Sequence, residues 1–170
     1  TPLMNKNIRQ SLFFLFLLFL QVLVLNNIIF LGHINPYLYI AFIFLYPLKE
    51  KRFTFLFLSF ILGLCVDFFS DSGGIHAFST IFIAYIRLFF VKVYFRKTTS
   101  DYSFFNLKSE AFGAVFNYVV TLTLIHHLIY FSFINFSLQN LSIVFLNTLY
   151  TSVFTLILFF LGTYIFTKNK

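Results

Sequence analysis

The sequence predicts an all-α integral membrane protein, a single bundle of six transmembrane helices with both ends of the chain in the cytoplasm. Of its 170 residues, 60% are hydrophobic and only 10% are charged, whereas an ordinary soluble domain carries roughly 25% charged residues. Long apolar segments recur along the chain, and basic residues lie between them. Such a composition suits lipid rather than water, because lipid-facing side chains must be apolar.

Five segments are long enough, or nearly so, to cross a membrane. Crossing a hydrocarbon core of roughly 30 Å takes about 20 apolar residues. The first segment, Ser11 to Leu31, follows a short polar stretch as a signal peptide would. It is longer than a typical signal core and no small-residue cleavage site follows it, so we expect a retained helix. The predicted long helices are 11–31, 53–69, which is marginal in length, 76–95, 111–133 and 141–166.

The segment 36–48 is the shortest of the six predicted helices. Asn35 and Pro36 are a typical N-cap and first-turn pair, while Pro47 weakens the far end. At 1.5 Å per residue this helix covers only about 20 Å. It is therefore either a short span beside other protein segments or a re-entrant segment.

The distribution of positive charge distinguishes these two alternatives. If all six segments cross, the loops 32–35, 70–75 and 134–140 contain no Lys or Arg, and one of the twelve basic residues, Arg87, lies within a span. Because basic loops stay in the cytoplasm, this pattern favours six crossings and explains the net charge of +7 without nucleic acid as a partner. The remaining basic residues are Lys6, Arg9, Lys49, Lys51, Arg52, Lys92, Arg96, Lys97, Lys108, Lys168 and Lys170.

Small and polar residues recur at helical spacing on four of the predicted helices. Such residues mark the faces through which membrane helices associate. We therefore expect the last four helices to form a packed bundle, and 11–31, where Gln21 is the main polar residue, to face lipid or an apolar partner. The stripes are Ser59, Gly63 and Asp67; His76, Thr80, Ala84 and Arg87; Gly113, Asn117 and Thr121; and Thr148, Ser152 and Thr155.

Asp67 and Arg87 are charged residues within predicted spans. A carboxylate near the centre of a span costs about 2.5–3.5 kcal/mol, and Asp67 lies closer to a helix end, where the cost is smaller. One interpretation is that Asp67 binds a ligand or a proton. The favoured interpretation is that it hydrogen-bonds the following turn, and in that case Asp67→Asn is expected to preserve assembly. Arg87 lies roughly 16 Å along the helix from His76, so we expect it to extend toward the cytoplasm. His76 is then the better-placed partner of Asp67.

The sequence indicates neither a catalytic site nor a metal or cofactor site. His126 and His127 are adjacent and so about 100° apart around a helix, which suits buried hydrogen-bonded histidines better than joint metal binding. Cys65 is the one cysteine. There is no phosphate-binding loop, nucleophile elbow or HExxH motif. An intramembrane enzyme needs its polar groups at one depth, and here they are spread over several.

Residues 63–78, GLCVDFFSDSGGIHAF, resemble the characteristic segment of MreD, the rod shape-determining membrane protein of bacteria. The segment has a glycine, an aspartate four residues later, a short Ser/Gly turn and a His-Ala start to the next helix. Residues 21–27 and 35–37, the chain length and the basic ends are also similar to that family. The motif positions are Gly63, Asp67, Asp71, Gly73, Gly74 and His76, and the resemblance assigns them no catalytic role.

The resemblance implies a non-enzymatic scaffold in the bacterial cytoplasmic membrane, which regulates cell shape and peptidoglycan synthesis by binding the bitopic protein MreC. It also implies direct or indirect links to MreB, RodA and a penicillin-binding transpeptidase, and leaves a homo-oligomer possible. The implied fold is similar to that of the substrate-binding subunits of energy-coupling factor transporters. A vitamin-type carrier subunit is therefore the alternative function. Those subunits usually carry alanines at a spacing of four on helix 1, and 11–31 has none.

Overall fold

The chain folds into helices, and the segments long enough to span a membrane agree with the prediction. The computed structural model describes residues 6–28, 34–48, 51–97, 107–136 and 141–168. Within these ranges there is no sheet. The candidate membrane spans are Asn7–Asn27, Arg52–Ser70, Ile75–Phe95, Phe112–Ile134 and Leu141–Ile165. The prediction of an all-α, multi-pass membrane protein is therefore confirmed.

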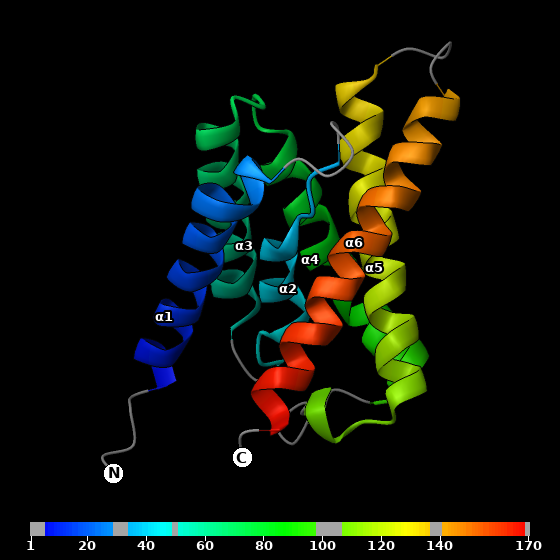
Figure 1. Cartoon of the computed structure of the whole chain (residues 1–170). Coiled ribbons are helices and arrows are strands. Elements are labelled where there is room, and N and C mark those ends of the chain that lie inside the picture. The colour runs from blue at the N-terminus through cyan, green and yellow to red at the C-terminus, as the bar shows by residue number, and fades with distance from the viewer. Residues whose placement is uncertain (1–5, 29–33, 49–50, 98–106, 137–140, 169–170) are drawn as a thin grey trace.

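Four helices follow the predicted boundaries to within two residues. They are α3 (Arg52–Ser70), α4 (Ile75–Phe95), α5 (Phe112–Ile134) and α6 (Leu141–Lys168). They lie side by side in chain order, each antiparallel to the next (Figure 1). We call the end of the bundle that holds both chain ends and the start of α3 the lower end, and the end with the α3–α4 turn the upper end.

The first predicted helix is not regular along its length. It consists of α1 (Lys6–Phe19), a π-helical turn η1 (Leu20–Val24) and a 3-10 turn η2 (Leu25–Asn27). The predicted end near residue 31 was wrong for Ile28, which is extended, and residues 29–31 lie outside the described ranges. The wide turn holds Gln21, whose fully buried side chain bonds to groups beyond the helix, and inserted polar contacts are a usual cause of such turns.

The predicted helix 36–48 is much shorter in the structure. It consists of a 3-10 turn η3 (Leu38–Ile40) and the five-residue helix α2 (Ala41–Leu45). Tyr46 is extended because it precedes Pro47, and the residue before proline is disfavoured in helical conformation. The chain descends through the middle of the molecule here (Figure 1), and the segment is enclosed by protein.

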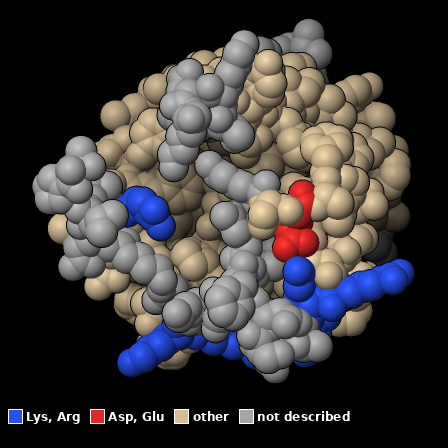
Figure 2. All heavy atoms as spheres, turned by 90° about the horizontal axis from the view of Figure 1, so that it is seen from below, with Lys and Arg blue, Asp and Glu red and all other residues tan. Residues whose placement is uncertain are grey.

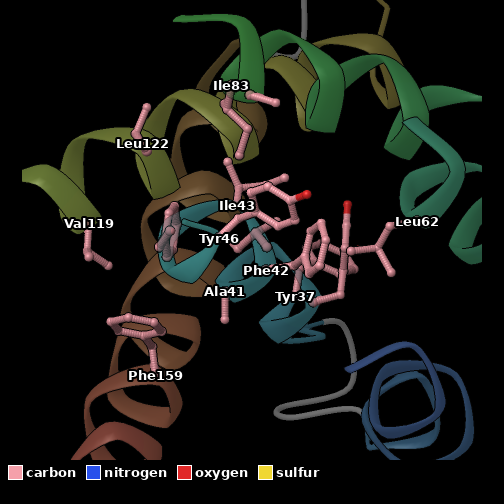
Figure 3. Packing of buried hydrophobic residues seen from close by; sticks show 14 of the residues in the cluster. Tyr37, Ala41, Phe42, Ile43, Tyr46, Leu62, Ile83, Val119, Leu122 and Phe159 are labelled. Carbon is pink, nitrogen blue, oxygen red and sulfur yellow. The ribbon is translucent and has the colours of Figure 1, made fainter. Parts of the chain in front are cut away.

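The short helix α2 is the centre of the hydrophobic core. Residues 39–44 are each at most 4% exposed. Phe42 packs against two rings of α1, Phe44 against Tyr118 and Phe159, and Tyr46 against Phe55. A helix that is apolar all round must be buried, and Figure 3 shows α2 side chains meeting residues of the surrounding helices, including Leu62, Ile83, Leu122 and Phe159.

Helix α1 lies on one side of this core. It contacts α2 and α3, with Leu17 and Leu18 buried, while Leu12, Phe16 and Phe19 are exposed. At its upper end, Asn26 Nδ2 donates to Ser70 Oγ of α3 at 2.9 Å. The outer face of this helix is therefore apolar and exposed, as a helix that faces lipid or an apolar partner requires.

Basic residues gather at the lower end. The start of α1, the start of α3, the end of α4 and the end of α6 all lie there (Figure 1), and the view from below in Figure 2 shows Lys and Arg spread around this end with far fewer carboxylates. The helix ends that carry Lys and Arg therefore lie together at one end of the bundle.

Candidate functional site

The motif at 63–78 forms the tight turn between α3 and α4. Asp71 ends α3 in the left-handed conformation (φ 51°), and Gly73 and Gly74 follow with φ of 64° and 94°. Glycine adopts positive φ without penalty, and aspartate tolerates it better than most residues. The short Ser/Gly turn expected here is confirmed, and both glycines adopt positive φ.

Gly63 allows the two helices to approach each other closely. A Cβ at this position would lie 2.6 Å from the Cα of Ala77 and 2.8 Å from the carbonyl oxygen of His76. These are backbone atoms, which cannot rotate away as a side chain would. Small residues let membrane helices approach in this way, so a larger residue at Gly63 would force α3 and α4 apart.

Asp67 on α3 caps the start of α4. Its carboxylate accepts hydrogen bonds from Ser72 Oγ at 2.5 Å and from the backbone N–H groups of His76 and Ala77 at 2.9 and 2.7 Å. Those two N–H groups belong to the first turn of α4, where no intrahelical acceptor is available, and negative charge is favourable at a helix N-terminus. The hydrogen bonds that the structural interpretation of Asp67 requires are therefore present.

The predicted pairing of Asp67 with His76 was correct only for the backbone. The ring of His76 turns away and places Nδ1 2.9 Å from the hydroxyl of Tyr39. The same hydroxyl lies 2.9 Å from His126 Nε2 and 3.2 Å from Thr80 Oγ1. A tyrosine hydroxyl has one hydrogen, so it donates to one of these groups and accepts from the others. Tyr39 thus connects η3, α4 and α5 at the centre of the bundle.

His127 belongs to a second set of contacts that reaches α6. Its Nδ1 lies 2.7 Å from the carbonyl oxygen of Thr123, which can only accept, so Nδ1 carries the hydrogen. Its Nε2 lies 3.3 Å from Thr155 Oγ1, and this hydroxyl oxygen accepts from the backbone N–H of Tyr37 at 3.0 Å. Both adjacent histidines are therefore buried and hydrogen-bonded, as expected, and they contact different partners.

Aromatic rings fill the space around these histidines. His76 stacks on Tyr130 with ring centroids 4.3 Å apart, and Tyr37 lies 4.9 Å from His76 and 5.5 Å from His127. The Tyr37 and Tyr130 hydroxyls are 3.0 Å apart. We call His76, His126, His127, Tyr37, Tyr39 and Tyr130 the histidine–tyrosine cluster. In the described part of the chain, no three His, Cys, Asp or Glu residues are placed to hold a metal ion.

Arg87 is fully enclosed, so the prediction that it extends toward the cytoplasm was wrong. Its side chain, 1% exposed, donates to the carbonyl oxygens of Phe44 and Tyr46 at the end of α2 and, through Nε, to the Tyr118 hydroxyl at 3.0 Å. Its guanidinium carbon lies 4.9 Å from the centre of the Phe55 ring. Arg87 therefore satisfies backbone carbonyls that Pro47 leaves without helical donors.

Several buried polar atoms of α5 and α6 have no hydrogen-bond partner among the described residues. They are His126 Nδ1, Thr123 Oγ1, Thr148 Oγ1, Thr151 Oγ1 and Ser152 Oγ. Buried polar groups are usually paired with protein or ordered water, so these atoms are positions where water or a small polar ligand would be stabilised.

A groove of about 680 Å³ opens between α1 and α6 near the lower end. Its floor is formed by Leu38 of η3 and by Ala41 and Leu45 of α2. The α1 wall includes Phe16, which is 51% exposed, and the α6 wall includes Gly162 and Tyr164. Glu110, near its lower rim, pairs with Lys97 at 3.4 Å. The groove is thus apolar along its length with one carboxylate at the end.

Sequence analysis predicted some of the residues described in this subsection and missed others. Gly63, Asp67, Asp71, Gly73, Gly74 and His76 do come together at the α3–α4 turn, while Arg87 lies apart from them near the end of α2. Tyr39 was missed because it lies in an apolar segment and its partners are 37 and 87 residues away. Gln21 was visible as the main polar residue of its span, and its bonds to Pro36 O and Asn26 Oδ1 explain its burial.

Comparison with known proteins adds no relative to this description. No family model matches the chain, and no curated protein or solved structure is found to be similar to it.

Proposed function

We propose that this chain is a non-enzymatic membrane scaffold that acts by binding a second membrane protein, in the manner implied by its resemblance to MreD. In this proposal it lies in a bacterial cytoplasmic membrane and crosses it six times, with the segment containing α2 as the short crossing and both termini in the cytoplasm. The fold is then of the kind found in the substrate-binding subunits of energy-coupling factor transporters.

The apolar groove between α1 and α6 is the observation that carries this proposal. Tyr39 and Arg87 at the centre of the bundle are engaged with other polar groups of the chain. The groove instead presents apolar side chains to the outside. Membrane proteins associate through close packing of such surfaces, so this arrangement supports a protein-binding role better than catalysis.

The proposed partner is an MreC-like bitopic protein, and through it the elongation machinery of MreB, RodA and a penicillin-binding transpeptidase. The segment 63–78 supports this choice. Its residues have specific geometric roles here, in a close helix approach at Gly63, a cap at Asp67 and a left-handed turn. The scaffold would regulate cell shape and peptidoglycan synthesis by positioning that partner.

Co-purification tests the proposal. The tagged chain is co-expressed with the MreC-like protein of the same organism, extracted in mild detergent and captured, and the bitopic protein is expected to elute in a stoichiometric complex. An unrelated bitopic protein of similar length is the control and should be lost on washing. If the MreC-like protein is lost equally, in detergent and in lipid nanodiscs, the scaffold role is rejected.

The proposed orientation predicts which residues are accessible from each side. In a Cys65→Ser background, cysteines replacing Lys51 and Lys97 should be protected from a membrane-impermeant maleimide in intact spheroplasts and react after lysis. A cysteine replacing Phe136, at the end of α5 near the upper end, should react in intact spheroplasts because it faces outward. Labelling of Lys51→Cys and Lys97→Cys from opposite sides would exclude this topology.

A vitamin-type carrier subunit remains the second candidate, and the unpartnered hydroxyls of α6 favour it. Thr148, Thr151 and Ser152 are buried and lack hydrogen-bond partners in the described ranges, as a site for a small polar ligand would require. A carrier should be stabilised against thermal unfolding by its ligand. A thermal-shift screen of water-soluble vitamins in detergent therefore separates the two functions.

A further inference from the structure

We propose that the groove between α1 and α6 is the docking site for one transmembrane helix of the bitopic partner, with that helix crossing α6 at Gly162 and a basic residue of its cytoplasmic flank meeting Glu110. This inference rests on the proposed scaffold function and names the site where the partner binds.

The α6 wall of the groove leaves room for a helix to approach closely. Gly162 lines the α6 wall, and a Cβ built on it would meet nothing within 4 Å. The floor opposite holds Ala41, which is only 4% exposed, so contact with an incoming helix falls mainly on the walls. A glycine on such a wall lets a second helix come close enough for backbone contact. Phe16 and Tyr164, which are 51% and 63% exposed, stand on opposite walls and would cover the flanks of that helix.

The charge at the lower rim selects the kind of occupant. Among the described residues that line the groove, Glu110 alone is charged, and it stands at an end where basic side chains predominate (Figure 2). Cytoplasmic flanks of membrane helices are enriched in Lys and Arg. A carboxylate has two oxygens and several acceptor positions, so Glu110 can accept from a partner cation as well as from Lys97, which lies 3.4 Å away.

The same carboxylate disfavours the other apolar occupant, an anionic lipid. At the rim a basic side chain can pair with the Glu110 carboxylate, whereas a phosphate headgroup cannot, since both groups are negatively charged. A second copy of this chain would bring a whole basic end beside this one, whereas a single helix flank needs to bring only the cation that pairs with Glu110. A single helix with a basic flank satisfies both the apolar groove and its acidic rim.

Two glycine substitutions provide a matched test. Gly162→Phe fills the groove, and Gly113→Phe makes the same change on α5 at a position that also has open space within 4 Å but does not line the groove. Retention of the MreC-like protein in the capture experiment should fall by about tenfold for Gly162→Phe, since a few central residues dominate such interfaces, and stay within about twofold of wild type for Gly113→Phe. The melting temperature of each variant is measured to show that both fold.

Cysteine cross-linking and charge reversal then identify the occupant. In the Cys65→Ser background, Gly162→Cys should form disulfides with single cysteines placed along the partner's helix at intervals of three or four residues, and Gly113→Cys should not. Glu110→Lys should weaken retention, and reversing the partner's basic flank to Glu should restore it, a rescue that a purely structural Glu110 would not produce.

The outcomes separate this inference from the proposed function. If wild type retains the partner and folded Gly162→Phe retains it equally, the groove is not the docking site, although the scaffold role stands. If wild type never retains the partner, the scaffold role itself fails. Disulfides between two copies through Gly162→Cys, or phosphatidylglycerol displaced by Gly162→Phe in native mass spectrometry without loss of the partner, would also overturn the helix assignment.

Discussion

Replacing Asp67 by alanine is expected to lower the free energy of unfolding by about 4 kcal/mol, because hydrogen bonds to a charged group are worth about 1.5–3 kcal/mol each and are not fully additive. The substitution removes all three hydrogen bonds that join the end of α3 to the start of α4. It leaves the N–H groups of His76 and Ala77 buried without an acceptor. Titration with sodium dodecyl sulfate from mild detergent, followed by circular dichroism, measures the change.

Asparagine provides the graded version of this experiment. Asp67→Asn keeps one acceptor oxygen but turns an NH2 group toward a backbone N–H, so the loss should be about half that of alanine and assembly should survive. Asp71→Asn makes the same chemical change four residues later at an exposed position, where asparagine tolerates positive φ, and should leave stability unchanged. Equal effects of the two asparagine variants would contradict the capping role of Asp67.

Replacing Arg87 by methionine is expected to destabilise the protein by about 3 kcal/mol, since an unsatisfied buried polar group costs about 1–3 kcal/mol. Methionine fills much of the volume but leaves the carbonyl oxygens of Phe44 and Tyr46, and the Tyr118 hydroxyl, without their donor. Release of the buried positive charge offsets part of this cost. Hydrogen exchange should quicken first in residues 41–45, because α2 loses the group that secures its end.

Two further arginine variants make the result specific. Arg87→Lys keeps the charge and can still donate to the carbonyls, so it should recover part of the stability. Arg52→Met removes an exposed guanidinium that lies over the Tyr85 ring at 5.1 Å, and its effect should stay below about 1 kcal/mol, as for other exposed cation–π pairs. If Arg87→Met proves as mild as Arg52→Met, the role assigned to Arg87 is wrong.

The long helices could be predicted because their signal is local. Each consists of a continuous apolar stretch whose length alone matches the membrane, so α3 to α6 end within two residues of the predicted positions. The α3–α4 turn was predictable for a similar reason, since Gly73 and Gly74 mark positive φ directly in the sequence. The stripe containing Gly63 and Asp67 also indicated correctly which face of α3 meets its neighbour.

The contacts within the bundle could not be predicted from the same signals. Helical spacing shows that Arg87 lies on a polar face, but not that Pro47 releases carbonyl groups within reach of it. The expectation that Arg87 extends toward the cytoplasm assumes that water is its nearest source of hydrogen-bond acceptors. In the structure the backbone carbonyls at the end of α2 are nearer to its guanidinium group. The contacts of His76 and His126 could not be predicted for a similar reason, because their shared partner Tyr39 is 37 and 87 residues away from them in the sequence.

The enclosure of α2 has a consequence for biogenesis. A helix of five residues with a short 3-10 turn before it cannot partition into the bilayer by itself, since a stable span takes about 20 apolar residues. The carbonyl oxygen of Phe44 accepts from Arg87 of α4, and the Phe44 ring packs against rings of α5 and α6. All three of these helices emerge from the ribosome after α2. The packing of this segment therefore has to wait for the rest of the chain, so that a part of the core that is synthesised early is completed late.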